Sequence, residues 1–143
     1  MVSEPEISVC DNKGGFMAQY VSGSSGFWHF HPEYEIMLNI NLNGTRIVGD
    51  SIELFDSGDL VLIGGNTPHC WTYNKDSGNS GQGRGIMIHF NLSSIGEALL
   101  AQHELHSVRR LLADSERGIR FSTGDALLVE SHLENMVNTR GIE

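Results

Sequence analysis

Three histidines and a glutamate stand out in this chain as side chains that could bind a metal ion together: His29, His31, Glu35 and His69. They occur in two separate segments, one near residue 30 and one near residue 69. Imidazole nitrogens and a carboxylate oxygen suit borderline divalent metals such as zinc, iron, nickel or manganese. The spacing therefore predicts that the four side chains share one pocket, which would bind either a divalent metal ion or a small ligand alone.

Four residues can form one site only if the chain bends between them. The two histidines of the first segment are two apart, so in a strand they point to the same side. Glu35 shares that parity, but in a straight strand it would lie roughly 13 Å from His31. Pro32 fixes its own backbone angle and keeps His31 extended. We therefore expect a turn here, with Glu35 opening the next, antiparallel strand, while a glycine-rich turn places His69 from another strand.

The strand that follows the turn predicts a ligand-binding face. From Glu35 to Leu42, apolar and polar positions alternate, so one side of the strand would face an interior cavity. On the second segment, two aromatic residues share the face of His69. The candidate ligand-binding residues are Trp28, Glu35, Met37, Asn39, Asn41, Trp71 and Tyr73. Buried asparagine side chains need hydrogen-bond partners, which water or a polar ligand would supply.

The other histidines give weaker signals. His89 is ambiguous, because its strand alternates apolar residues with Met87, His89 and Asn91. His103, His106 and His132 fall in the helical part and are expected to face solvent. The chain has no Ser-His-Asp order, phosphate-binding glycine loop or paired-cysteine metal motif, so no catalytic residue is predicted.

Short strands separated by glycine turns dominate residues 1–92, which is typical of a sandwich or barrel. The first expected strands are Ile7–Cys10 and Phe16–Val21, and Asn43-Gly44 is a strong hairpin signal. We expect a mainly β, barrel-like domain over residues 1–92.

The pattern changes to helical spacing after Leu92. One helix is expected from about Ile95 until Gly118, and a second from Thr123 toward Gly141. We expect residues 93–143 to form a helical extension of two α-helices packed on the barrel.

Composition excludes several classes of protein. The 143 residues suit a single domain, and no segment approaches the ~20 apolar residues of a membrane span. Lys and Arg number 9 against 18 Asp and Glu, a net charge of −9, so the chain alone is a poor nucleic-acid binder. The acidic N-terminus is no secretory signal, and two cysteines make no disulfide framework. The cytoplasm is the expected compartment.

The histidine segments resemble the two motifs of the cupin family. His-x-His, three residues and Glu, followed later by Gly-Asp and Pro-His, match those motifs, with Gly26 and Gly44 framing the first and Gly58 opening the second. The chain is most similar to the N-terminal cupin of AraC-type transcriptional regulators. The strings that carry this likeness are His31–Glu35, Gly44–Ile52, Gly58–Trp71, Glu104–Leu112 and Arg117–Phe121. The second motif departs from the family, with Ile63-Gly-Gly in place of its proline and Tyr73 in place of a polar residue.

The resemblance implies a double-stranded β-helix, or jelly-roll barrel, that senses a small polar effector, for example a sugar. It also implies that DNA is bound only through a helix-turn-helix part that this chain does not contain. The alternative is a metal-dependent cupin oxygenase or isomerase that uses His29, His31, Glu35 and His69. A third interpretation is a module that pairs through its helices as a homodimer. No membrane partner is expected.

Overall fold

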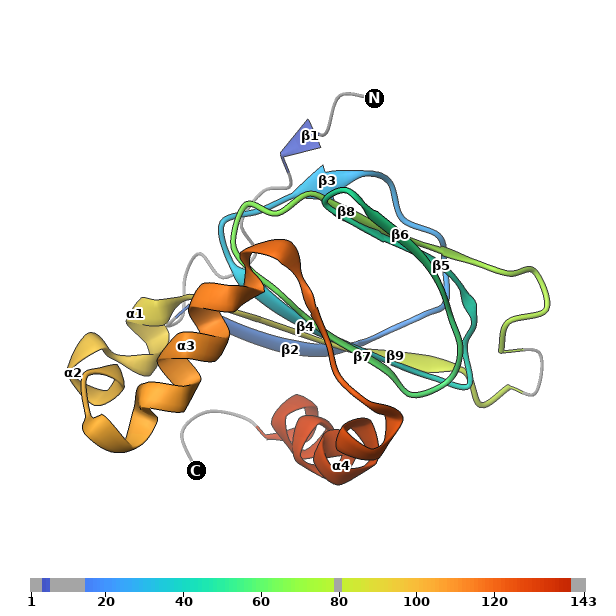
Figure 1. Cartoon of the computed structure of the whole chain (residues 1–143). Helices are drawn as coiled ribbons and strands as arrows, with labels where there is room; N and C mark the ends of the chain where they lie inside the picture. The colour runs from blue at the N-terminus through green and yellow to red at the C-terminus, as the bar shows by residue number, and fades with distance from the viewer. Residues whose placement is uncertain (1–3, 6–14, 79–80, 140–143) are drawn as a thin grey trace.

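Two five-stranded sheets face each other across the interior of the molecule (Figure 1). The computed structural model describes residues 4–5, 15–78 and 81–139. In the first sheet, the strands in order are β1 (Glu4–Pro5), β3 (His29–Phe30), β8 (His69–Tyr73), β5 (Gly44–Val48) and β6 (Ser51–Phe55). In the second sheet, they are β10 (Ile119–Arg120), β7 (Asp59–Ile63), β4 (Tyr34–Ile40), β9 (Arg84–Phe90) and β2 (Phe16–Val21).

The helices follow the barrel in the sequence, and α4 covers the outer side of the second sheet (Figure 1). They are α1 (Leu92–Ile95), α2 (Glu97–Leu100), α3 (His106–Asp114) and α4 (Thr123–Asn138), with the 3₁₀ turns η1 (His103–Leu105) and η2 (Ser115–Arg117). The predicted fold class, a mainly β cupin-like barrel with helices after it, is confirmed.

Strand β4 separates the interior of the barrel from a second core that lies outside it, under the helices. Its alternation places Glu35, Met37 and Asn39 toward the first sheet, where all three are buried. Leu38 points the opposite way, into a second core that includes Leu100 of α2, Leu112 of α3, and Ala126 and Leu133 of α4. Both faces of this central strand are therefore covered, one by the opposite sheet and one by helices.

The helical part differs from the two predicted helices. Gly96, with a φ of +91°, separates α1 from α2, and the chain turns again before α3 begins. Helix α4 begins as predicted, because Ser122 caps it and Asp125 completes a capping box.

The described chain after residue 92 also adds a strand to the barrel. Strand β10 pairs with β7, which the sequence patterns did not predict. The domain boundary at residue 92 stays a prediction, and the expected strand over 7–10 lies outside the described residues. Within the described residues, no helix is long and apolar enough to cross a membrane.

Candidate metal and ligand site

A crossing between the two sheets brings the first segment of the candidate site together. His29 lies in β3 of one sheet and Glu35 in β4 of the other, so the chain crosses the barrel at Pro32. The expected turn is present, but β4 is not the antiparallel neighbour of β3. As a result, His31 Nε2 lies 3.0 Å from Glu35 Oε2. His69 opens β8 and is the direct cross-strand partner of His29.

Glycines allow the two histidine-bearing turns to touch. A Cβ at Gly65 would collide with the carbonyl oxygen of Pro32, so only glycine fits there. The neighbouring Asn66 N–H donates to the carbonyl of His31 over 2.7 Å, which joins the turns. The local sequence thus fixes the distance between the first and second segments.

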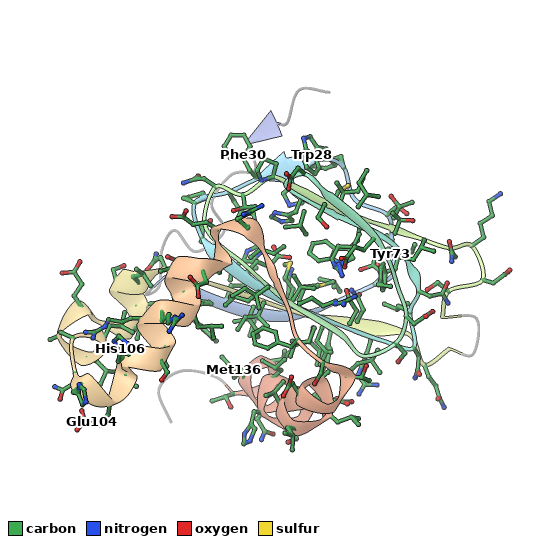
Figure 2. The ribbon with its side chains drawn as sticks, in the orientation of Figure 1. Trp28, Phe30, Tyr73, Glu104, His106 and Met136 are labelled. Atoms are coloured by element: carbon green, nitrogen blue, oxygen red, sulfur yellow. The ribbon has the colours of Figure 1, made fainter. Side chains whose placement is uncertain are left out.

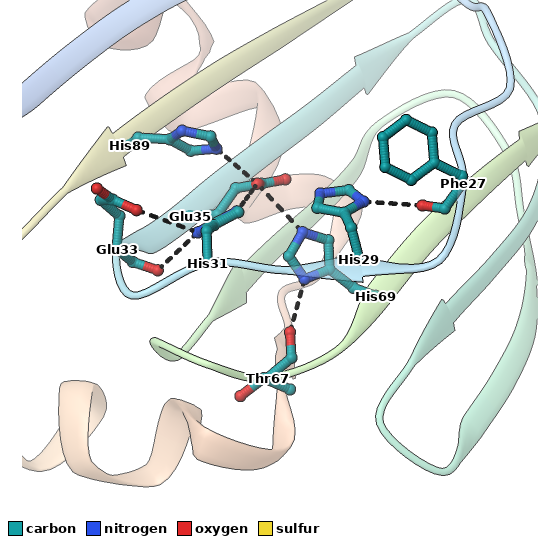
Figure 3. A network of polar contacts seen from close by, with 8 residues as sticks. All are labelled: Phe27, His29, His31, Glu33, Glu35, Thr67, His69 and His89. Atoms are coloured by element: carbon teal, nitrogen blue, oxygen red, sulfur yellow. Dashed lines mark hydrogen bonds and ion pairs between the residues drawn. The ribbon is translucent and has the colours of Figure 1, made fainter. Parts of the chain in front are cut away.

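Glu35 is the centre of the cluster (Figure 3). Its Oε2 lies 3.0 Å from His31 Nε2, 3.3 Å from His69 Nε2 and 2.7 Å from His89 Nε2. Burial raises the pKa of Glu35, but the contacts with the three imidazoles lower it more, so the pKa is well below its usual value. The carboxylate is therefore negative, and one of its oxygens is surrounded by three imidazole rings.

Three of the histidines are held in the same tautomer. The Nδ1 atoms of His29, His31 and His69 lie 2.8, 3.1 and 2.7 Å from the backbone carbonyls of Phe27, Glu33 and Thr67, respectively. A carbonyl can only accept, so each Nδ1 carries the proton. In the neutral ring, each Nε2 then presents a lone pair, as metal-binding histidines with anchored rings do.

This arrangement fits a divalent cation. In the neutral form, His31 and His69 would direct Nε2 lone pairs at the Glu35 oxygen, whereas the lowered pKa of Glu35 requires that these atoms donate to it or that a positive charge lies nearby. The contacts become favourable if both rings are imidazolium or if a cation lies among the donors. Donor atoms of His29, His31 and His69 lie within 4.8 Å of one another, as do those of His31, Glu35 and His89.

The predicted ligands His29, His31, Glu35 and His69 are divided between these two groups, the second of which adds His89, so the set of four stays a prediction. A bound divalent cation would supply a Lewis acid with positions for a small ligand. The buried Glu33 carboxylate lies 3.6 Å from His31 Nδ1, beyond the ring, as in carboxylate–histidine–metal arrangements.

A cavity of about 150 Å³ opens beside the cluster. Its lining residues are Val21, Ser22, Ser24, Gly26, His29, Glu35, Met37, Trp71, Tyr73 and Met87. An apolar cavity of about this size holds a benzene molecule in another protein. The wall here is mostly apolar with Glu35 and His29 on it, so it suits a compact molecule with an apolar body and a polar end.

Four of the predicted ligand-binding residues line this cavity: Glu35, Met37, Trp71 and Tyr73. Burial raises the pKa of Tyr73 well above its usual value, and the charges of Glu35 and Asp59 raise it further. The phenol therefore stays protonated and donates to Asn39 Oδ1 over 2.8 Å. Asn39 is fully buried next to Tyr73, behind the cavity wall.

Two predicted positions lie away from the cavity. Asn41 was expected to face the interior, but β4 ends at Ile40 and Asn41 has a φ of +53° in an exposed turn. Because the strand stops, the alternation that would turn Asn41 inward stops with it. Trp28 lies with Phe30 on the outer side of β3, whereas Tyr73 points between the sheets (Figure 2). Trp28 is thus on the opposite strand face from His29.

His89 is the residue that the sequence left ambiguous. It is 3% exposed and pairs across strands with Glu35, because β9 runs antiparallel to β4 in that register. Its parity with Met87, which faces the cavity, was visible in the sequence. What the sequence lacked was the pairing of β9 with β4.

A second polar cluster is formed by the buried Arg46 and Asp59 and the partly exposed Glu53. Arg46 Nη2 lies 2.8 Å from Glu53 Oε2 and 3.3 Å from Asp59 Oδ1. Burial raises the pKa of Asp59, and the positive charge of Arg46 offsets part of that rise. Each charge in this cluster has an opposite charge beside it.

Comparisons with known proteins agree with the fold. No protein-family model and no curated protein sequence matches the chain. A structure of ToxT from Vibrio cholerae matches at 12% identity with a TM-score of 0.55, over 90% of this chain and 49% of ToxT. The chain thus spans about half the length of ToxT, and this likeness supports a shared cupin-like fold.

Two further structures match with TM-scores below 0.5, and neither carries an argument about function. ToxT from Vibrio cholerae O395 bound to (E)-4-(8-methylnaphthalen-1-yl)but-3-enoic acid matches at 10% identity and TM-score 0.39, over 88% of this chain and 59% of that one. A proposed mannose-6-phosphate isomerase from Ralstonia eutropha JMP134 matches at 13% identity and TM-score 0.44, over 56% of this chain and 78% of that one.

Proposed function

We propose that this chain is the ligand-sensing barrel of a cytoplasmic transcriptional regulator, and that a small polar molecule binds in the cavity beside Glu35. The AraC-type motifs in the sequence and the fold shared with ToxT support the class. DNA would be bound by a helix-turn-helix part outside this chain. The homodimer expected from the helices stays a prediction.

One observation carries the sensing role: the histidine-bearing turn is hydrogen-bonded to the chain that leads into the C-terminal helix. Thr67, whose carbonyl anchors His69, donates its hydroxyl to the carbonyl of Glu116 over 2.9 Å. Gly64 N–H donates to the carbonyl of Ser115 over 2.8 Å. A ligand that favours one arrangement of this turn would also favour one arrangement of η2, β10 and α4.

The cavity limits the effector. Its volume suits a compact molecule, so a sugar would extend beyond the cavity, past Ser22 and Ser24 on its wall. The apolar wall, including Met37, Met87 and Trp71, favours a ligand with an apolar side, and Trp71 offers a ring face.

A thermal-shift panel of small sugars, hydroxy acids and carboxylic acids, each with and without zinc, tests the proposal. A true effector raises Tm in proportion to the logarithm of its concentration, because it binds only the folded chain. Met87→Trp should fill the cavity and abolish the shift. Met136→Trp, the same change on α4, should leave it intact. A panel without any shift argues against the sensor.

Hydrogen exchange then separates sensing from simple binding. Addition of the effector should slow or speed exchange over residues 115–139, outside the cavity. A change limited to the cavity walls would contradict transmission to α4.

The second candidate function is a metal-dependent cupin oxygenase or isomerase. The anchored histidine tautomers favour it, because they prepare lone pairs for a metal with or without a sensing role. Elemental analysis of protein purified without added metal is the first test. Stoichiometric iron, nickel or manganese would favour the enzyme, and turnover of a substrate lost on His69→Ala would decide for it.

A further inference from the structure

His89 lies against Glu35 in a way that differs from the other histidines. The two residues are direct cross-strand partners on β9 and β4, and both are buried. The 2.7 Å between His89 Nε2 and Glu35 Oε2 is the shortest contact that this oxygen makes with an imidazole. Figure 3 shows His89 reaching the carboxylate from the side opposite His29.

The chemistry of the contact also differs. His31 and His69 each donate the Nδ1 proton to a backbone carbonyl. In the neutral ring, each Nε2 atom therefore has a lone pair directed toward Glu35. A carboxylate only accepts, and at 2.7 Å the His89 Nε2 is at ordinary hydrogen-bond distance. His89 Nε2 therefore donates to the Glu35 carboxylate, and this is the shortest of the three imidazole contacts to that oxygen.

We propose that His89 is a positioning residue of the metal site: its Nε2–H fixes the Glu35 carboxylate beside the lone pairs of His31 and His69. The site would then use five side chains, four that hold a borderline divalent cation and one that orients the carboxylate. This inference rests on the proposed metal site. Hydrogen-bond partners beyond the direct ligands commonly change metal affinity 10–100-fold.

The substitution His89→Gln keeps an amide N–H near the position of Nε2, whereas His89→Leu removes the donor at similar bulk. His103→Gln, on an exposed histidine of η1, is the matched control. Each protein is titrated with Co²⁺, followed by visible absorption, and affinities are measured against a competing chelator. Thermal unfolding of each metal-free variant checks its fold, and His89→Asn, whose amide is too short to reach Glu35, replaces His89→Leu if that variant does not fold.

We expect His89→Leu or His89→Asn to weaken Co²⁺ binding about 10–100-fold, with His89→Gln and His103→Gln close to wild type. Wild-type affinity in the Leu or Asn variant overturns the role of His89 while leaving the metal site standing. A loss in His89→Gln as large as that in His69→Ala also overturns it, because His89 would then be a direct ligand. A wild-type protein that binds no Co²⁺ removes the metal site and this inference together.

Discussion

The barrel encloses two polar clusters, and they solve the problem of buried charge in different ways. Arg46 has carboxylates of Glu53 and Asp59 within 3.3 Å, and Arg120 Nη1 lies 3.5 Å from Glu53 Oε2, so two cations face two carboxylates in the cluster. Glu35 contacts three imidazole rings, and two of them, His31 and His69, would direct Nε2 lone pairs toward it in the neutral form because their Nδ1 atoms are anchored. A cluster that balances its own charge suits a structural role, and one whose carboxylate faces histidine side chains suits binding.

The largest expected difference between the clusters is in metal binding. His69→Ala should weaken Zn²⁺ binding more than about 100-fold, because it removes a direct ligand and not only an outer partner. Arg46→Met should leave the affinity unchanged. Calorimetric titration measures both, and equal losses in the two variants would show that the site responds to general damage.

The free energy of unfolding should show the reverse order, with the larger effect in Arg46→Met and the smaller in His69→Ala. Arg46→Met leaves the buried Asp59 without its cation, which should lower the free energy of unfolding by about 3–5 kcal/mol. Urea unfolding of the metal-free protein measures this. The double variant Arg46→Met, Asp59→Leu should recover part of the loss, because no lone charge then stays buried. A single variant as stable as wild type would contradict a structural role for the pair.

A smaller effect tests the connection from the site to the helices. Thr67→Val removes the hydroxyl bond to the Glu116 carbonyl and should cost about 1 kcal/mol of unfolding free energy. Its control is Thr72→Val, at an exposed position on β8. If Thr67→Val also abolishes the ligand-induced exchange change over residues 115–139 while binding persists, the bond carries the signal. If the exchange change over residues 115–139 is unaltered in Thr67→Val, the hydroxyl bond contributes to packing alone.

The smallest effect is a pH dependence at Asp59. Its folded-state pKa is raised, so the native state keeps a proton that the unfolded chain releases above about pH 3.9. Stability from this group is therefore complete below pH 3.9 and falls as the pH rises through the raised pKa. The stability of wild type relative to Asp59→Asn should be greatest near pH 4 and smaller at pH 7. A difference that grows with pH would mean that Arg46 lowers the pKa below its usual value.

The sequence alone predicted much of the barrel and the centre of the site. Strand parity and Pro32 were enough to bring His31 to Glu35, since both depend on local backbone geometry. Trp71 and Tyr73 followed from their parity with His69.

The sequence-based predictions failed where the position of a residue depends on which strands pair and where they end. Asn41 left the interior because its strand ends one residue earlier, in a left-handed turn. His89 could not be assigned without knowing that β9 pairs with β4, and β10 forms only because β7 offers it an edge. Trp28 has the size and aromatic character expected of a cavity wall, but its place in the strand alternation puts its side chain on the outer face of the barrel.

X-ray absorption at the metal edge, on protein loaded with one equivalent of Zn²⁺, tests the central claim most directly. The account predicts one tightly bound ion per chain with three imidazole nitrogens and a carboxylate oxygen in its first shell. A shell of oxygen atoms without imidazole, or no stoichiometric binding, would contradict it.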